Sequence, residues 1–75
     1  MTVAEEPTVR LTDRQLEAAR LMAQGLSDDE IADVMGIRPR TVKYHLEGVR
    51  NKLRLNYRRE IPYALQQQGY KVYEG

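Results

Sequence analysis

The chain has 75 residues, a length that suits one small domain with a single core and does not suit two domains. It contains no Cys and a single His, which excludes a disulfide-stabilised scaffold, a zinc knuckle and a thiol nucleophile. The net charge is only +1, but residues 1–37 hold eight acids against three bases and residues 38–75 hold nine bases against three acids. That division favours contact with a polyanion through one surface, although unevenly distributed solvated charges would give the same count.

Nothing in the sequence suggests a membrane protein or a secreted protein. No apolar run approaches the roughly 18 residues of a membrane span, and the first ten residues, MTVAEEPTVR, lack the basic and apolar regions of a signal peptide. We therefore expect a cytoplasmic protein without membrane contact. No metal site and no cofactor are expected, because neither a set of ligating side chains nor a glycine-rich phosphate loop is present. Residues 1–10 are expected to form a flexible arm.

The first predicted element is a helix that starts in the segment LTDRQL, residues 11–16. Thr12 stands at the N-cap position and Gln15 three residues later, which is the spacing of a capping box, and the flanking leucines form a hydrophobic staple. The helix is expected to run to about Gln24 and to end at Gly25. Its predicted buried face consists of Leu16, Ala19, Met22 and Ala23.

The segment LSDDEI, residues 26–31, repeats the same start signal. Ser27 is the predicted N-cap and Glu30 its partner, while the two aspartates between them lie at the positive end of the helix dipole. Gly36 supplies a left-handed stop, so this second helix is short. Its predicted buried residues are Ile31, Val34 and Met35.

The third segment, IRPRTV at residues 37–42, differs from the other two at the cap position. Pro39 fits the first turn of a helix, where its missing N–H costs nothing. Arg38 holds the cap position, and because arginine cannot accept a hydrogen bond, the helix start should lose about 1 kcal/mol relative to Ser or Asp. Arg40 adds a second cation at the positive end of the dipole. A bound anion would complete this helix start.

From Pro39 to about Arg54 the apolar residues form one narrow stripe, which predicts a helix with a single buried face. The stripe consists of Val42, Leu46, Val49 and Leu53. At about 100° per residue, the opposite face carries Arg40, Tyr44, Glu47 and Asn51, with Lys43, Arg50 and Arg54 along one flank. This polar and partly basic face is the candidate functional surface.

A fourth helix is predicted from about Glu60 to Gln68, stopped by Gly69. Pro62 must lie in its first turn, because proline does not fit a helix interior. The apolar residues of this helix are Ile61, Ala64 and Leu65. Residues 71–75 form a C-terminal tail, and the alternation in YKVYEG predicts a short extended piece there.

The second and third predicted helices, joined by a turn of about four residues that contains Gly36, have the layout of a helix-turn-helix. The third helix is expected to be about 24 Å long, with a width that suits a DNA major groove. Its first two turns would reach base edges and its flanking cations would contact phosphates. The predicted fold is therefore all-α, with four helices in residues 11–70.

The segment from Leu11 to Tyr70 resembles the LuxR/GerE-type DNA-binding domain of bacterial transcription regulators. The resemblance rests on LTDRQ, GLSDDEIA, TVKYH and KL, which occur in the order and at the spacing of that family. It implies a four-helix domain whose third helix, residues 39–54, binds double-stranded DNA sequence-specifically, and whose fourth helix often forms a homodimer contact. A complete small regulator and an excised domain both fit, and the initial Met favours the former.

The resemblance and the exposed helix face select the same base-reading residues, Lys43, Tyr44 and Glu47. We expect Lys43 to donate to guanine, Glu47 to accept from cytosine N4 and Tyr44 to pack on a thymine methyl group. A solvated face with a weak Lys43 to Glu47 pair is the alternative. The candidate DNA-backbone contacts are Arg38, Arg40, Thr41, His45, Arg50, Asn51 and Arg54. Thr41 and His45 enter this set through the resemblance, and a plain boundary role for the histidine is equally open.

The candidate dimer contacts, also implied by the resemblance, are Ile61, Ala64, Leu65 and Gln68. Pro62 departs from the family's pattern in this segment, so the apolar residues could instead be core residues. Arg38 replaces the usual Ser, and Asp28 and Asp29 replace Asn and Lys, which adds negative charge near the DNA backbone. These acids motivate a rival function, a protein-interaction module that binds a regulator or a polymerase subunit. An enzyme is not expected, because the single His has no carboxylate or nucleophile at a suitable spacing.

Overall fold

A computed structural model describes residues 10–67, so the predicted N-terminal arm up to residue 9, Gln68 and the tail at 71–75 lie outside the described residues. The described part contains α1 (Asp13–Ala23), α2 (Asp28–Met35), α3 (Pro39–Lys52), the 3-10 turn η1 (Arg58–Glu60) and α4 (Ile61–Gln67). Residues 10–67 include no strand, which confirms the predicted all-α architecture. Within the same range, no helix has the length and apolar character needed to cross a membrane.

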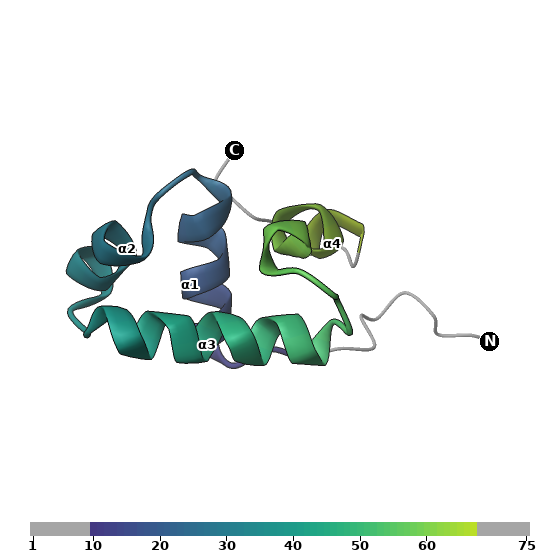
Figure 1. The fold of residues 1–75 in the computed structure, drawn as a ribbon, viewed down its shortest axis with the longest axis horizontal. Helices are drawn as coiled ribbons and strands as arrows, with labels where there is room; N and C mark the ends of the chain where they lie inside the picture. Colours follow the sequence, from purple (N-terminus) through teal and green to yellow (C-terminus); the bar gives the residue numbers. More distant parts are fainter. Residues whose placement is uncertain (1–9, 68–75) are drawn as a thin grey trace.

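The four helices enclose one core (Figure 1). The longest helix, α3, runs along one side of the molecule, with α2 beside its start and α4 near its end (Figure 1). Behind it, α1 crosses α3 and also contacts α2 and α4. The buried residues come from all four helices and from the residue after α3: Ala18, Ala19, Ile31, Ala32, Met35, Val42, Leu46, Val49, Leu53, Ile61 and Leu65.

Both predicted capping boxes are present. At the start of α1, Thr12 Oγ1 accepts from the Gln15 backbone N–H at 3.0 Å, and Gln15 Oε1 accepts from the Thr12 N–H at 3.0 Å. At the start of α2, Ser27 Oγ accepts from the Glu30 N–H at 3.2 Å, and Glu30 Oε1 accepts from the Ser27 N–H at 2.8 Å. Each box satisfies two N–H groups that a helix start otherwise leaves without partners.

Three helices end in the same way, with one residue in the left-handed conformation. That residue is Gly25 after α1 (φ 97°), Gly36 after α2 (φ 70°) and Arg54 after α3 (φ 59°). In each case the next residue donates its N–H to a carbonyl five residues earlier, the bond of a Schellman motif. These bonds are Leu26 to Leu21 at 3.3 Å, Ile37 to Ala32 at 3.0 Å and Leu55 to Arg50 at 3.0 Å. The three donors are half-buried and pack against the core.

A glycine of α3 lies close to α1. A Cβ added at Gly48 would lie 2.5 Å from Nε2 of Gln15. The Gln15 side chain is held there, because its Oε1 accepts from Lys52 Nζ at 2.9 Å as well as from the Thr12 N–H. Lys52 Nζ also donates to the carbonyl of Arg10 at 3.1 Å. The capping box of α1 is thus linked to the last turn of α3.

The predicted buried faces of α1 and α2 need correction. In α1 the fully buried residues are Ala18 and Ala19, whereas Leu16, Met22 and Ala23 are only half-buried. Periodicity gives the direction of a buried face but not the closeness of the neighbouring helix, and small alanines permit the closest approach. The burial of Leu16, Met22 and Ala23 was therefore overestimated.

In α2, Val34 is 59% exposed and Ala32 is buried, the reverse of the prediction. The buried direction of this short helix runs through Ile31, Ala32 and Met35. At about 100° per residue, Val34 lies roughly 110° from the centre of that direction. An eight-residue helix contains too few apolar residues for its sequence to define the face.

The predicted buried stripe of α3 and the predicted start of α4 are confirmed, while the predicted stop of α4 at Gly69 lies outside the described residues. All four residues of the predicted stripe, three in α3 and Leu53 directly after it, are at most 8% exposed. Pro62 lies in the first turn of α4, which continues directly from η1. Ile61 and Leu65 are fully buried in the core, and Ala64 is half-buried against it. This burial agrees with the core role that the sequence left open for them.

Candidate nucleic-acid interface

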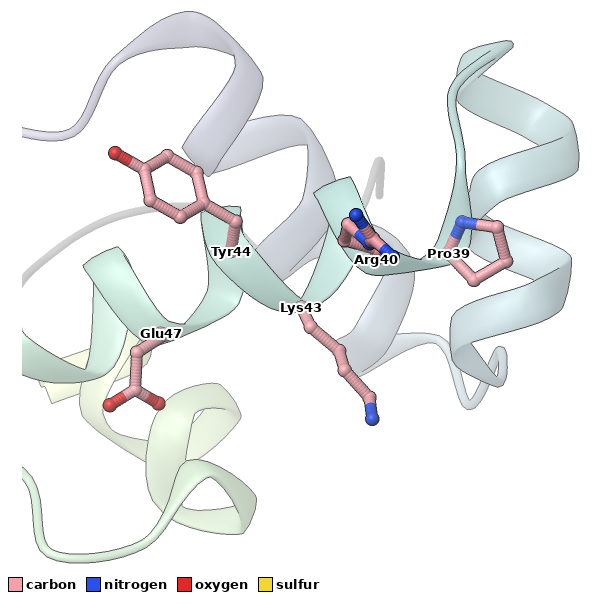
Figure 2. Close-up of a pocket in the computed structure, with 5 residues that line it drawn as sticks. All are labelled: Pro39, Arg40, Lys43, Tyr44 and Glu47. Carbon is pink, nitrogen blue, oxygen red and sulfur yellow. The ribbon is translucent and has the colours of Figure 1, made fainter.

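The face of α3 opposite its buried stripe carries a shallow surface hollow of about 670 Å³. Its lining residues are Pro39, Arg40, Lys43, Tyr44 and Glu47 (Figure 2). Figure 2 shows Lys43 and Glu47 extending to one side of the helix and Tyr44 to the other. Tyr44 is 77% exposed, a high value for a large aromatic side chain. All three predicted base-reading residues therefore line the same hollow, with Tyr44 on one side of it and Lys43 and Glu47 on the other.

The start of α3 lacks the side-chain cap that α1 and α2 have. Arg38 is the N-cap residue, with extended backbone angles of φ −88° and ψ 151°, and its side chain makes no cap hydrogen bond. Its carbonyl already accepts from the N–H groups of Thr41 at 2.9 Å and Val42 at 3.1 Å. The backbone is arranged as for a Ser or Thr cap, but the side chain is an exposed cation. The predicted electrostatically unfinished start is confirmed.

Thr41 and His45 lie at the edge of the interface. Both are half-buried, between the exposed face of α3 and its buried stripe. The rings of His45 and Tyr44 are tilted by 59°, with 6.2 Å between their centroids. The histidine is therefore a boundary residue that also contacts a predicted base reader.

Glu47 is paired with Arg50 one turn later in α3. Nε of Arg50 donates to Glu47 Oε1 at 3.2 Å, and Nη2 donates to Glu47 Oε2. The hydrogen bond from Arg50 holds the pKa of Glu47 below its ordinary value, and the same bond raises the pKa of the Arg50 guanidinium. Among residues 10–67, the ion pair that Glu47 makes is this one, and not the pair with Lys43 that the alternative interpretation of this face assumed.

Arg50 has further partners at the end of α3. Its Nη1 donates to the carbonyl of Leu55 at 2.8 Å, and its Nη2 donates to Asn51 Oδ1 at 3.0 Å. Arg50 and Asn51, which were both predicted to contact the DNA backbone, are therefore hydrogen-bonded to each other. The three-residue spacing of Glu47 and Arg50 is a helix-pair signal that could have identified this ion pair from the sequence.

The acidic start of α2 has a partner that sequence reasoning missed. Arg58 of η1 donates through Nη1 to Asp28 Oδ2 at 3.2 Å and through Nη2 to Oδ1 at 2.5 Å. The Asp28 side chain is 20% exposed and that of Arg58 is 40% exposed. Asp29 is exposed on the same turn. No local signal predicts the pair, because its members lie 30 residues apart in sequence.

The geometry agrees with comparisons to known proteins. Residues 9–63 match the family model for bacterial regulatory proteins of the luxR family. NarP, the nitrate/nitrite response regulator protein of Escherichia coli (strain K12), is 41% identical over 54 residues, which are 72% of this chain and 25% of NarP. The transcriptional activator protein AnoR of Acinetobacter nosocomialis is 44% identical over 46 residues, 61% of this chain and 19% of AnoR. The chain thus spans at most 25% of the length of these two relatives.

Two solved structures share the fold. The response regulator ChrA of a heme-sensing two-component system superposes with a TM-score of 0.76 at 32% identity, covering 88% of this chain and 33% of that chain. The Vibrio cholera VqmA, in its complex with a ligand and DNA, gives a TM-score of 0.79 over 99% of this chain and 32% of VqmA. At 24% identity the second likeness shows the fold alone. The family match covers most of the chain and includes the whole helix-turn-helix. The chain therefore belongs to the luxR family of bacterial regulatory proteins and is a DNA-binding domain of the transcription-regulator type, not an enzyme.

Proposed function

We propose that this domain reads double-stranded DNA sequence-specifically by placing α3 in the major groove. The observation that carries the proposal is the hollow on the free face of α3, lined by Lys43, Tyr44 and Glu47. These side chains are exposed, whereas the opposite stripe is buried and holds the helix on the domain. With 14 residues α3 is about 21 Å long, which suits a major groove.

The phosphate contacts are proposed at both ends of α3 and along its edge. Arg38 and Arg40 are exposed at a start without a side-chain cap, where an anion would meet both the helix dipole and two cations. Thr41 and His45 border the same end, and Arg54 is exposed at the other end. Arg50 already donates to Glu47 and to the carbonyl of Leu55, so it is not included among the proposed phosphate contacts. Asn51 is exposed beside it.

The pairing of Asp28 with Arg58 favours DNA over the rival protein-interaction module. That rival was motivated by acids at the start of α2, where they would repel phosphates. Because the guanidinium of Arg58 bonds both oxygens of Asp28, one of the two negative charges is compensated inside the domain. Only Asp29 remains as an exposed acid in place of the family's cation.

We further propose a homodimer on DNA that forms through the outer face of α4. Since Ile61 and Leu65 are buried in their own core, the contact would use Ala64 and the 69% exposed Tyr63, and continue towards Gln68, which lies outside the described residues. A two-fold dimer would bind half-sites about 34 Å apart. Sedimentation of the chain with a two-half-site duplex should show two copies bound, and Tyr63→Glu should reduce this to one. The domain is expected to act in the cytoplasm, where the bacterial chromosome lies.

Selection of bound duplexes from a random DNA pool tests the proposed function. We expect enrichment of one sequence, and we expect Tyr44→Ala and Lys43→Ala each to weaken binding to it about tenfold, by removing one base contact. Tyr57→Ala, which removes an exposed tyrosine that is not part of α3, is the control and should bind as the parent does. Absence of enrichment at both low and moderate salt would overturn the proposal and favour the protein partner.

A further inference from the structure

Arg50 forms two parallel hydrogen bonds to the carboxylate of Glu47. The Nε and Nη2 groups of the guanidinium face the two carboxylate oxygens, the fork arrangement that fixes a carboxylate in both position and plane. A lysine at this position would provide a single point charge, without that geometry. Glu47 is therefore held in one orientation on the edge of the hollow, before any ligand arrives.

The guanidinium is itself anchored. Its Nη1 donates to the carbonyl of Leu55, which follows the left-handed turn at the end of α3, and Nη2 also donates to Asn51. The Arg50 side chain is only 26% exposed, against 54% for Glu47. To reach a phosphate, Arg50 would have to break bonds with three residues of the domain. Its position suits a support for Glu47 better than a contact to DNA.

The pairing changes what Glu47 presents to a base. Its negative charge is compensated by the neighbouring cation, so that phosphates repel it less, and its rotamer is ordered in advance, which reduces the entropy lost on binding. A carboxylate has about four acceptor positions, so a doubly bonded one can still accept from a base amine. Cytosine N4 fits, because adenine sets the acceptor N7 beside its amine and guanine presents only acceptors.

We propose that Arg50 is a positioning residue that fixes the Glu47 carboxylate to select cytosine, and that it contributes specificity and not phosphate affinity. This inference rests on the proposed function, since it assumes that α3 reads bases. It assigns Arg50 to a different role from the backbone contact expected from the sequence. A phosphate-contacting Arg50 would instead strengthen binding to all sequences alike.

The experiment measures base preference as the ratio of the Kd for a changed duplex to the Kd for the selected duplex. With the full chain and the selected duplex, the Kd is measured for that duplex and for versions changed at each base pair of the half-site. The base pair read by Glu47 is identified as the one whose preference Glu47→Gln alters. We expect the parent chain to prefer cytosine there by about tenfold, within the range of a good base contact.

Arg50→Lys is the decisive variant, because it keeps the positive charge and removes the pair of parallel hydrogen bonds to the Glu47 carboxylate. We expect it to reduce the cytosine preference severalfold at that base pair alone, and Arg50→Met to abolish the preference. The matched control is Arg14→Lys in α1, since Arg14 likewise bonds a carboxylate three residues later, Glu17, and a backbone carbonyl, that of Met35. This control should leave every ratio unchanged.

Each outcome has a defined meaning. If Arg50→Lys keeps the cytosine preference, or if Arg50→Met weakens all duplexes equally and lowers the salt slope by about one, the inference is overturned while sequence-specific binding stands. If the parent chain selects no sequence, the proposed function itself fails. Thermal unfolding checks that the variants are folded at the assay temperature.

Discussion

Arg54 occupies a backbone position that glycine fills at the ends of α1 and α2. A left-handed conformation costs a non-glycine residue about 1 kcal/mol. We therefore predict that Arg54→Gly raises the free energy of unfolding by about that amount, while it weakens DNA binding and lowers the salt slope by up to about one through loss of a phosphate contact. Denaturant unfolding and a salt series of Kd values measure the two effects.

Arg54→Lys is the control, because it keeps both the strain and the charge. It should match the parent chain in stability and in salt slope. A glycine variant that is more stable yet binds DNA unchanged would remove Arg54 from the interface. A variant that binds more weakly without gaining stability would show that the left-handed turn carries no strain.

The pKa of Glu47 depends on its hydrogen bond with Arg50. The Arg50 hydrogen bond lowers the pKa of Glu47 from its ordinary value of 4.5. A lowered pKa means that the ionised form favours folding, so this contribution is present above pH 4.5 and is lost as the pH falls through the lowered pKa. We predict that Arg50→Met returns the pKa towards 4.5, measured by NMR titration of the Glu47 carboxyl carbon. Arg14→Met should leave the pKa of Glu47 unchanged. If Glu47 has the same pKa in Arg50→Met as in the parent chain, the pairing with Arg50 is contradicted.

Helix α3 begins without a side-chain cap, although its N-cap residue has the backbone angles of a capping residue. Arg38→Ser should restore the cap bond, because the residue already has extended angles, and should add about 1 kcal/mol to the free energy of unfolding. The same change should weaken binding to the selected duplex and lower the salt slope by up to about one. Arg38→Lys keeps a cation and should retain the slope. Unchanged binding by Arg38→Ser would exclude a phosphate contact at this position.

The packing of α1 against α3 permits a test by double mutation. Replacing Gly48 with Ala in a helix gains about 1 kcal/mol of propensity, but the new Cβ would displace Gln15 from its bonds to Thr12 and Lys52. We predict that Gly48→Ala adds little stability to the parent chain and adds about 1 kcal/mol in a Gln15→Ala background. Denaturant unfolding of the four proteins gives the coupling. Equal gains in both backgrounds would show that Gln15 moves aside without cost.

The ion pair between Asp28 and Arg58 joins the start of α2 to the segment before α4, 30 residues away in the chain. Asp28→Asn should release Arg58 as a free cation and remove an acid near the DNA, so we predict tighter DNA binding and a stability loss of no more than about 1 kcal/mol. Asp29→Asn removes a neighbouring acid and should tighten binding without that loss. Salt-dependent Kd values and thermal unfolding separate the two variants. Equal stability of both would mean that the pair contributes nothing to folding.

Signals that act within a few residues were readable from the sequence. The two capping boxes, the stops at Gly25 and Gly36 and the buried stripe of α3 each depend on spacings of at most four residues, and each was predicted. The exposure of Val34 and the pairing of Asp28 with Arg58 depend on where other helices lie, which no local pattern reports. The exposed face with Lys43, Tyr44 and Glu47 was predicted as a set. The ion pair of Arg50 with Glu47 was not predicted, because Lys43, four residues before Glu47, was considered as its partner instead.

The stop of one helix and the cap of the next lie only two residues apart. Gly25 ends α1 and Ser27 caps α2, with only Leu26 between them, and Gly36 and Arg38 enclose Ile37 in the same way. Both intervening residues pack on the core, so neither turn has slack. We therefore expect the angle between α2 and α3 to be fixed by this packing. A signal that regulates DNA binding is then expected to act on the domain as a rigid body, for example by covering the face of α3.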